Sequence, residues 1–390
     1  MSQSIETTPL AASNRFLKLL QERLASQVKI PFEISIFDGS SYHFGSGRPQ
    51  FEIKINDRNG LLALSQLDEC RLCEAYMDGS IDIIGNMLEV MSLQSAFTDS
   101  HPLHHLWRRI TPVLTGQVFT DKRSIAQHYD FDPEFYLSFL DESRCYSQAI
   151  FERDDEALNV AQRRKFDYVI SACRLQKGDR LLDVGGGWGA LTEHAGRQGI
   201  EVTSLTISQE SMSFLTDLIE RLQLPCRVLQ QNFLEYELET EEKYDAIAIL
   251  GVMEHLPNYE AVLEQCQRLL KPGGRVYLDA SSIREKHKLP TFISTYIYPG
   301  NHSFFCLHDF LEKQAKTPFE LDVAFNDRHS YYLTCKIWAE NLDRSREGIV
   351  ERWGESLYRR FHLYLWSSAY AFLNHRLDAY RVVLWLPQND

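Results

Sequence analysis

A glycine-rich loop directly after an apolar segment is the strongest chemical feature of the sequence. Residues 181–189 read LLDVGGGWG, and a segment that favours a helix follows. Because glycine has no Cβ, Gly185 and Gly187 let the backbone approach a ligand closely, and the start of the helix places unpaired amide groups beside it. A dinucleotide loop has glycines at relative positions 1, 3 and 6, whereas this loop has them at 1, 2, 3 and 5. The absence of a sixth-position glycine indicates a ligand without a pyrophosphate.

The order D-x-G-x-G-x-G in this loop is typical of S-adenosylmethionine (SAM) methyltransferases. In such loops the residue at the position of Asp183 orders the turn and the sulfonium end of the cofactor. The next expected strand, residues 201–207, ends in Thr206 and Ile207 without the acidic residue that usually holds ribose hydroxyls. The loop therefore favours SAM, with another nucleotide or a purely structural turn as the alternatives.

Short strands that alternate with helices are expected to position this loop. Helical segments separate the first four expected strands, and the strands lie at 180–185, 201–207, 245–250, 275–280 and 380–386. This alternation is typical of a parallel, doubly wound α/β sheet. The last strand follows a long helical stretch instead of a simple crossover, so we expect an antiparallel edge strand there. The predicted fold class is thus a Rossmann-like sheet of the class I SAM-methyltransferase type.

The first 120 residues are expected to form a small α+β accessory domain and a linker. Residues 32–36 and 51–55 alternate apolar and polar side chains, as half-buried strands do. Asp38-Gly39 marks a hairpin turn after the first of these strands. Residues 61–98 are expected to be mostly helical.

A junction rich in His, Trp and Arg at residues 101–117 separates this domain from the rest of the chain. Two prolines and a glycine break any long helix there. The segment is either a solvated linker or a contact to lipid headgroups, where Trp and Arg are favoured. Residues 121–390 are expected to form the catalytic domain. An insertion at about 281–330 would cap the substrate cleft, and its His302 either reaches the site, since it follows Tyr-Pro-Gly-Asn directly, or lies at the surface, which is the favoured interpretation.

The composition excludes several classes of protein. Of the 390 residues, 44% are hydrophobic and 24% are charged, which excludes a disordered or collagen-like chain. The 54 acidic residues outnumber the 41 Lys and Arg, and a net charge of −13 argues against a nucleic-acid partner. Eight scattered cysteines, without a signal segment or a long apolar run, predict a cytoplasmic protein that does not span a membrane. Cys70 and Cys73 lack a second Cys pair, so no metal site is expected.

Six segments of the expected catalytic domain carry a further shared pattern. They read HYD at 128–130, CYSQ at 145–148, FERDD at 151–155, TIS at 206–208, GVMEH at 251–255 and FISTYIYPG at 292–300. In this order they resemble the cyclopropane-fatty-acyl-phospholipid synthases and mycolic acid cyclopropane synthases, a family of SAM-dependent methyltransferases. The resemblance covers most of residues 121–390, and the N-terminal unit is similar to the accessory domain of the longer members that act on phospholipids.

The resemblance implies SAM as the cofactor and assigns its contacts. Where many relatives carry Gln, this chain has Ser211, and it has Gly186 where relatives usually carry Cys. The first change is expected to weaken ribose contacts and the second to be tolerated. The implied SAM-binding residues are Tyr146, Ser147, Asp183, Gly185, Gly187, Thr206, Ile207 and Asn232.

The family reaction adds one carbon to an unactivated cis alkene. Methyl transfer leaves a carbocation on the acyl chain, and a base must then remove a proton. A cyclopropane closes if the new methyl group loses the proton, and a methylene or methyl-branched alkene forms if a neighbouring carbon loses it. Water would capture the cation, so the resemblance implies an apolar tunnel with few polar groups.

The residues that hold the base differ from the family pattern. In the family a bound bicarbonate is the base, and a Cys, a Glu, a His and a Tyr hold it. Glu254 and Tyr331 are present here, but Gln148 stands at the Cys position and Asp279 at the His position. A second carboxylate near Glu254 would repel an anion, which makes bicarbonate doubtful. The expected catalytic residues are Glu254, His255, Tyr331, Asp279 and Gln148.

Two interpretations of Asp279 stay open from the sequence. Asp279 either supplies the base itself, oriented by Gln148, or binds backbone and loop donors in a remodelled site.

The sequence leaves three functions open. The first is C-methylation of an unsaturated acyl chain of a phospholipid by an enzyme that docks transiently and peripherally on the inner membrane face, with a monomer and a homodimer both left open. The second is methylation of a soluble amine or polyketide, and the third is a non-catalytic protein that binds SAM and lipid.

Overall fold

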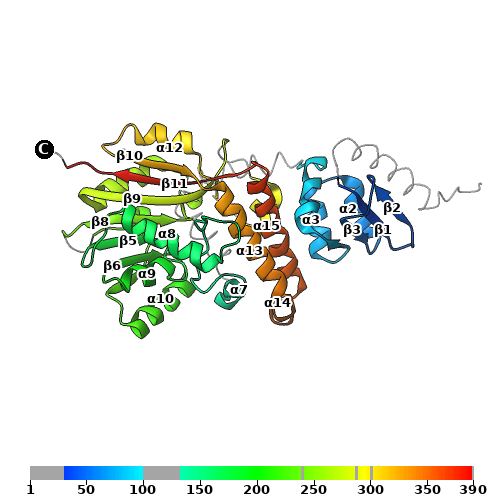
Figure 1. The fold of residues 1–390 in the computed structure, drawn as a ribbon, viewed down its shortest axis with the longest axis horizontal. Helices are drawn as coiled ribbons and strands as arrows, with labels where there is room; N and C mark the ends of the chain where they lie inside the picture. Colours follow the sequence, from blue (N-terminus) through cyan, green and yellow to red (C-terminus); the bar gives the residue numbers. More distant parts are fainter. Residues whose placement is uncertain (1–29, 100–131, 239–240, 286–288, 299–301, 389–390) are drawn as a thin grey trace, which may run out of the picture. The chain divides into compact units, whose positions relative to one another are not determined.

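The computed structural model describes residues 30–99, 132–238, 241–285, 289–298 and 302–388 (Figure 1). They form two compact units. The small unit comprises residues 30–99 and 346–370, and the large unit comprises the other described residues, which lie between 132 and 345 and at 371–388. The junction at 101–117 and the HYD segment lie outside the described residues.

A seven-stranded sheet forms the centre of the large unit, with the strand order β10-β11-β9-β8-β5-β6-β7 (Figure 1). The strands from β5 to β9 pair with their neighbours in parallel, which confirms the predicted doubly wound sheet. These strands are β5 (Arg180–Val184), β6 (Glu201–Thr206), β7 (Cys226–Gln230), β8 (Tyr244–Leu250) and β9 (Leu270–Ser282).

The antiparallel strand that the sequence predicts is present, but it does not lie at the edge. Strand β11 (Asp378–Trp385) runs antiparallel between β9 and β10. Strand β10 (Glu320–Asn326), which the sequence analysis assigned to the insertion, takes the edge position. Its apolar side chains are largely exposed, 42% for Leu321 and 52% for Phe325. Because an edge strand buries so little, its sequence carries only a weak strand pattern.

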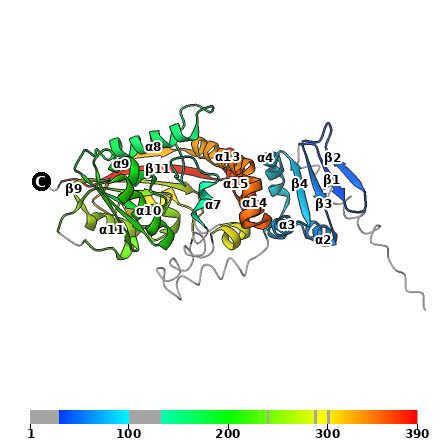
Figure 2. The same ribbon diagram turned by 90° about the horizontal axis from the view of Figure 1, so that it is seen from below.

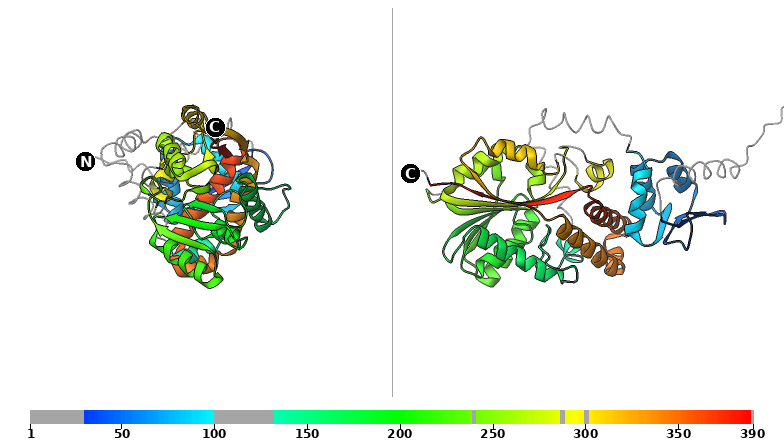
Figure 3. Two further views of the ribbon diagram at one scale, coloured as in Figure 1. Left: turned by 90° about the vertical axis from the view of Figure 1, so that its left-hand side faces the viewer. Right: turned by 45° about the horizontal axis from the view of Figure 1, so that its top comes forward.

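Helices cover both faces of this sheet. On one face, α8 (Leu158–Ala172) and α9 (Ala190–Gly196) pack against the alanines of β8. On the other face, α11 (Tyr259–Leu269) and α12 (Leu307–Gln314) pack against the isoleucines of the same strand. Figure 2 shows α8 and α11 on opposite sides of β11, and the right-hand view of Figure 3 shows the same layers from another direction. The remaining helices of this unit are α7 (Pro133–Leu137), α10 (Gln209–Leu222), α13 (Arg328–Arg344), the 3-10 helices η2 (Phe233–Glu235) and η3 (Met253–His255), and the π-helix η4 (Ile293–Ile297).

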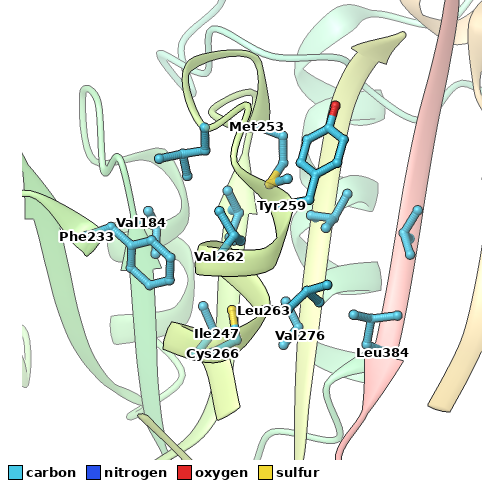
Figure 4. Packing of buried hydrophobic residues seen from close by; sticks show 14 of the residues in the cluster. Val184, Phe233, Ile247, Met253, Tyr259, Val262, Leu263, Cys266, Val276 and Leu384 are labelled. Carbon is cyan, nitrogen blue, oxygen red and sulfur yellow. The ribbon is translucent and has the colours of Figure 1, made fainter. Parts of the chain in front are cut away.

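The core beneath α11 fixes the strand ends that carry the candidate site. Val262, Leu263 and Cys266 of α11 belong to one buried cluster with Ile247 of β8 and Val276 of β9 (Figure 4). Burial of each such aliphatic side chain contributes about 2 kcal/mol to stability, as an upper estimate. This packing holds β8 and β9 side by side up to their carboxyl ends, where ligands bind in open α/β sheets.

The small unit is built on a four-stranded sheet with the order β2-β1-β3-β4. Strands β1 (Phe32–Ile36) and β3 (Phe51–Ile55) bury every second side chain, as their alternation predicts. The predicted hairpin is confirmed, because β2 (Ser41–Phe44) pairs antiparallel with β1. At its turn Gly39 has a φ of +88° and donates its N–H to the carbonyl of Ile36 at 2.9 Å.

The segment expected to be helical contains a strand as well. Helices α2 (Arg58–Gln66) and α3 (Glu69–Met77) begin at Asp57 and Asp68, whose carboxylates accept backbone N–H groups. After them β4 (Ile81–Gly85) pairs antiparallel with β3, so the helical prediction is wrong there. The apolar run of β4 is too short for hydrophobic periodicity to distinguish a strand from a helix. The chain continues into α4 (Met87–Val90) and the 3-10 helix η1 (Met91–Ala96).

Two helices from far along the sequence complete the small unit. Helix α14 (Arg346–Trp353) and residues 355–370 of α15 (Glu355–Leu373) belong to it, although the sequence analysis places them in the catalytic domain. Helix α15 is joined to α3 by a buried hydrogen bond of 2.9 Å between the hydroxyl of Tyr76 and Nδ1 of His362.

Arg359 of α15 makes the densest polar contacts between this helix and the N-terminal segment of the small unit. Its guanidinium forms ion pairs with Asp82 at 2.6 Å and with Glu355 at 2.7 Å. It also donates to the backbone carbonyls of Tyr76 at 3.0 Å and Ile81 at 3.1 Å. The side chain is only 14% exposed, so solvent cannot replace these partners fully.

Arg359→Met is expected to lower the free energy of unfolding of the small unit by about 2 kcal/mol, because two carbonyls and the Asp82 carboxylate lose a charged donor. Hydrogen exchange at β4, read alongside chemical denaturation, measures the loss. Arg71→Met is the matched control, since Arg71 is 59% exposed and pairs with Glu74 of the same helix at 3.0 Å. That variant should cost less than about 0.5 kcal/mol. Equal effects of the two changes would contradict the assignment.

Candidate active site

The glycine-rich loop leaves β5 in a conformation that requires glycine. Gly185 and Gly187 have φ values of +77° and +50°. The N–H groups of Gly185 and Gly186 both donate to the carbonyl of Leu205 in β6, at 2.9 and 3.0 Å. A Cβ on Gly185 would lie 2.5 Å from Cγ2 of Val252. The loop therefore packs tightly against β6 and against the segment that follows β8.

Asp183 stabilises the loop through hydrogen bonds to neighbouring elements. Its carboxylate accepts the hydroxyl of Thr192 at 2.9 Å and that of Ser204 at 3.4 Å, which ties β5 to α9 and β6. Burial raises the pKa of Asp183 to about 6, and the two hydrogen bonds oppose this rise. Asp183 does not line the cavity over this loop. It therefore supports the loop and would act on a ligand only by holding the loop in place.

A cavity of about 720 Å³, part of it open to solvent, lies over the loop. Five of the expected SAM-binding residues line it, and so do His255, Val252 and Ser211. Gln231 was missed by the sequence analysis, although it directly precedes Asn232. The five expected residues are Gly185, Gly187, Thr206, Ile207 and Asn232.

The two other expected cofactor contacts, Tyr146 and Ser147, do not line this cavity. The ring of Tyr146 packs against those of Tyr136 and Trp338, with centroids 5.5 and 5.1 Å away. Ser147 is buried, and its hydroxyl accepts a hydrogen bond from Nζ of Lys165 at 2.8 Å. A Cβ on Gly251 would lie 2.9 Å from Cβ of Ser147, so the segment passes close to the loop after β8.

Glu254 is a buried carboxylate with two different oxygens. It sits in η3, directly after β8, and is 4% exposed. Oε1 accepts the backbone N–H of Ser281 at 2.7 Å and the hydroxyl of the same residue at 2.6 Å. Oε2 is buried and has no hydrogen-bond partner among the residues that the structure describes. Burial raises the pKa of Glu254 to about 7, and the charge of Asp279 adds to the rise.

Asp279 lies in β9 and is fully buried, but both of its oxygens are engaged. Oδ1 accepts the N–H of Gly251 at 2.9 Å, and the hydroxyl of Tyr277 donates to Oδ2 at 3.4 Å. Ser147 contributes a further side-chain hydrogen bond, and Lys165 a favourable charge. Burial nevertheless raises the pKa of Asp279 to about 6.

Gln148 faces a carboxylate that the sequence analysis missed. Its amide nitrogen donates to Oδ2 of Asp327 at 3.2 Å, while its own Oε1 is buried without a partner. Arg381 pairs with the same carboxylate oxygen at 3.4 Å. Burial raises the pKa of Asp327 to about 7, Arg381 lowers it, and the charge of Asp279 raises it. Asp327 directly precedes α13, and no local motif marks it.

Tyr331 brings an aromatic ring to the same region. Its ring stacks on Phe372 at 4.4 Å and meets Trp338 edge to face at 6.4 Å. Burial raises the pKa of its hydroxyl well above the usual value, and the charges of Glu254 and Asp279 add to this rise. The tyrosine is therefore a neutral phenol at physiological pH, close enough to both carboxylates to sense their charge.

His255 lines the cavity, and burial lowers its pKa to about 4, so the imidazole is neutral at physiological pH. His302 lies beside it, with ring centroids 5.0 Å apart, and stacks on Tyr298 at 4.1 Å. The expectation that His302 lies at the surface is wrong, since the residue is 5% exposed. These rings form an aromatic cluster next to the cavity wall.

Ser204 explains why the loop carries Gly186. A Cβ on Gly186 would overlap Oγ of Ser204 and lie 3.2 Å from Cδ1 of Leu215. The serine hydroxyl thus fills the space that a side chain in the loop would need. The sequence marks the departure at Gly186, but only the structure identifies its partner in β6.

Gly186→Ala is expected to lower the free energy of unfolding by about 2 kcal/mol, because the added Cβ overlaps Ser204. Binding of S-adenosylhomocysteine, measured by calorimetry, should weaken in parallel as the loop shifts. Ser204→Ala alone should have a small effect, since Asp183 keeps its shorter hydrogen bond from Thr192. The double variant should recover most of the loss, and a double variant as weak as Gly186→Ala would refute this packing argument.

Comparison with known proteins places this geometry in a family. Residues 117–382 match the family described as mycolic acid cyclopropane synthetase, and residues 19–104 match a domain of unknown function (DUF7884). A probable fatty acid methyltransferase of Pseudomonas putida is 26% identical over 379 residues, with 93% of each chain covered.

Two solved structures resemble the chain over the large unit. The structure of the cyclopropane synthase MmaA2 from Mycobacterium tuberculosis is 28% identical, with a TM-score of 0.63, and the match covers 68% of this chain and 98% of that one. Mycolic acid cyclopropane synthase CmaA1, complexed with SAH and CTAB, is 27% identical, with the same TM-score and the same coverage. Since the family match spans well over half of the sequence, the chain belongs to the mycolic acid cyclopropane synthetase family of SAM-dependent methyltransferases.

Proposed function

We propose that this enzyme transfers a one-carbon unit from SAM to the cis double bond of an unsaturated fatty acyl chain, carried by a phospholipid. The product is a cyclopropane, or a methylene or methyl-branched chain. The observation that carries the proposal is Glu254, a buried carboxylate with one fixed and one unpartnered oxygen, next to residues that line the cofactor cavity. The relatives named fatty acid methyltransferase and cyclopropane synthase support the same chemistry.

The cavity over the glycine loop fits SAM. Gly185 and Gly187 bring the backbone to the cavity without side chains, and Thr206 and Asn232 offer polar groups on its wall. When bound, SAM supplies an electrophilic methyl group on a sulfonium. His255 is neutral at this wall, so it adds no positive charge that would repel the sulfonium.

The proton must leave the acyl chain after methyl transfer, in a region shielded from water. We propose that Glu254, Asp279, Tyr331 and Gln148 form the site of proton removal. Glu254 and Asp279 are buried at the carboxyl ends of adjacent strands, and their charges act on each other and on Tyr331. The stacked rings of Tyr331 and Phe372 offer an aromatic environment that suits a cation.

Bicarbonate does not fit this site. Asp279 places a second buried carboxylate near Glu254, and two carboxylates repel a further anion. The amide nitrogen of Gln148 already donates to Asp327. The chain offers no cation at Glu254 among the described residues, so nothing there compensates the charge of a bound anion.

The proposal extends to the rest of the molecule. We propose a catalytic domain from about residue 121 onward and an accessory domain before it. No described helix is long and apolar enough to cross a bilayer. Because a phospholipid acyl chain resides in the membrane, the enzyme is proposed to reach it by transient docking at the inner membrane surface. Assembly as a homodimer belongs to the same proposal.

Incubation with labelled SAM and vesicles of a cis-unsaturated phospholipid is expected to yield acyl chains heavier by one CH₂ group. Mass spectrometry of the hydrolysed chains measures the gain, and fragmentation separates a ring from a branch. Vesicles of a fully saturated phospholipid are the matched control and should give no product. Labelling of a soluble amine without any lipid product would refute the proposal.

Added bicarbonate is expected to leave the rate of wild-type turnover unchanged, because the Cys and His positions hold Gln148 and Asp279. The measurement compares initial rates in bicarbonate-depleted buffer with and without millimolar additions, at fixed pH and ionic strength. A marked stimulation would show that the ordinary base of the family operates here after all.

A further inference from the structure

Lys165 is a fully buried lysine that the proposed function does not use. It lies on α8 and has no exposed surface. We propose that Lys165 is a positioning residue for this reaction: through Ser147 it holds Asp279 as a carboxylate, and this leaves Glu254 to take the proton from the acyl chain. The inference rests on the proposed function and assigns separate roles to carboxylates that the proposed function treats together.

The contacts of Lys165 lead toward Asp279. Its Nζ donates to Sγ of Cys145 at 2.9 Å and to Oγ of Ser147 at 2.8 Å. Ser147 lies against Gly251, which donates its N–H to Oδ1 of Asp279 at 2.9 Å. The charge of Lys165 favours the ionised form of that carboxylate. A buried ammonium group is costly unless an anion compensates it, and Asp279 is a fully buried carboxylate that can do so.

A second cation neutralises the next carboxylate. Arg381 lies 3.4 Å from Asp327, and its guanidinium is sandwiched between the rings of Tyr168 at 4.4 Å and Phe325 at 4.6 Å. Gln148 donates to the same Asp327 oxygen. These neighbours fix Asp327 in place and leave Lys165 to balance Asp279.

Asp327 and Asp141 also sense the charge of Lys165, but Asp327 has Arg381 beside it and Asp141 is not part of the interior cluster. Asp141 is partly exposed and accepts both the hydroxyl and the backbone N–H of Ser143, at 2.8 and 3.2 Å. Burial raises its pKa, and Lys165 lowers it. The three carboxylates that are almost fully buried around this lysine and the site are therefore Asp279, Asp327 and Glu254.

Glu254 is the buried carboxylate of this group that no cation compensates. None of the ion pairs among the described residues involves it, and Oε2 has no hydrogen-bond partner. The ionisable groups that face it are Asp279 from β9, Tyr259 from α11 and Tyr331 from α13, and neither phenol is charged at neutral pH. Asp279 therefore acts on Glu254 as a fixed negative charge that increases its affinity for a proton.

The step balances without a further reactant. After methyl transfer, either a C–H bond of the new methyl group breaks and its electron pair closes the ring onto the cationic carbon, or a C–H bond on a carbon next to the cationic carbon breaks and its electron pair forms a double bond. The proton passes to Oε2 of Glu254, which becomes a neutral carboxylic acid. It returns to water between turnovers. A base whose pKa is about 7 is suited to take up and release a proton near neutral pH.

Lys165→Met tests the role of the buried ammonium. The base must be ionised to accept a proton. The pH–rate profile of the wild type should therefore have an ascending limb near the pKa of Glu254, about 7. Without Lys165 the proton is expected to move to Asp279, which removes the fixed charge beside Glu254. The limb should then shift to lower pH, and the maximal rate on cis-unsaturated phospholipid vesicles should fall about tenfold because Glu254 becomes a weaker base. Arg163→Met is the matched control, since Arg163 is exposed on the same helix.

Infrared titration of the carboxyl groups gives a readout that does not need turnover. Wild type should show the bands of Glu254 and Asp327 protonating near neutral pH, and the band of Glu254 should be missing in Glu254→Gln. Lys165→Met should show a further band, which should disappear in the double variant Lys165→Met, Asp279→Asn. The double variant buries no unpaired charge, so it is expected to fold even where the single lysine variant does not.

The outcomes separate this inference from the proposed function. Absence of lipid product from the wild type refutes the proposed function, while the infrared titration still tests the charge assignment. Wild-type turnover combined with an unshifted limb in both lysine variants overturns the inference and leaves Lys165 a purely structural role. Full activity of Glu254→Gln, with none in Asp279→Asn, would overturn it in favour of Asp279 as the base.

Discussion

One hydrogen bond joins the parts of the active site that lie on separate strands. The N–H of Gly251, directly after β8, donates to the carboxylate of Asp279 in β9 at 2.9 Å and to its backbone carbonyl at 3.0 Å. Gly251 has a φ of +64°, and Ser147 leaves no room for a side chain on it. This contact sets the course of the segment that carries both Val252 of the cofactor wall and Glu254. Cofactor cavity and proton acceptor therefore keep a fixed relation to one another.

Local sequence patterns account for most of the cofactor side. The loop at Gly185, the strand before it and the following helix are neighbours along the chain, so their spacing predicts the cavity without knowledge of the fold. The charge network could not be predicted in this way. Gln148 and Asp327 are 179 positions apart, and Lys165 meets Ser147 only because α8 covers the sheet there. Likewise, helical periodicity at 346–370 shows a helix but not which unit it joins.

Burial does two things at once in this site. It removes water that would capture a cation on the acyl chain, and it raises the pKa of Glu254 by denying its charged form solvation. In a deeper site without cations, the pKa of every carboxylate would rise further, and none would be ionised at neutral pH. Lys165 opposes this rise at Asp279, and Arg381 and Lys165 oppose it at Asp327. A dry site can thus still hold a base that ionises in the physiological range.

The fixed oxygen of Glu254 also bears on which product forms. Two donors from Ser281, its backbone N–H and its hydroxyl, hold Oε1 at 2.7 and 2.6 Å, so the carboxylate cannot rotate without losing both. Oε2, the proposed base, is consequently held at one point in space. Under this proposal, loss of a proton from the new methyl group or from a chain carbon depends on which of them the acyl chain brings to that point. The walls that position the chain, for which Tyr331 is a candidate, would then select the product, and the base would complete the reaction.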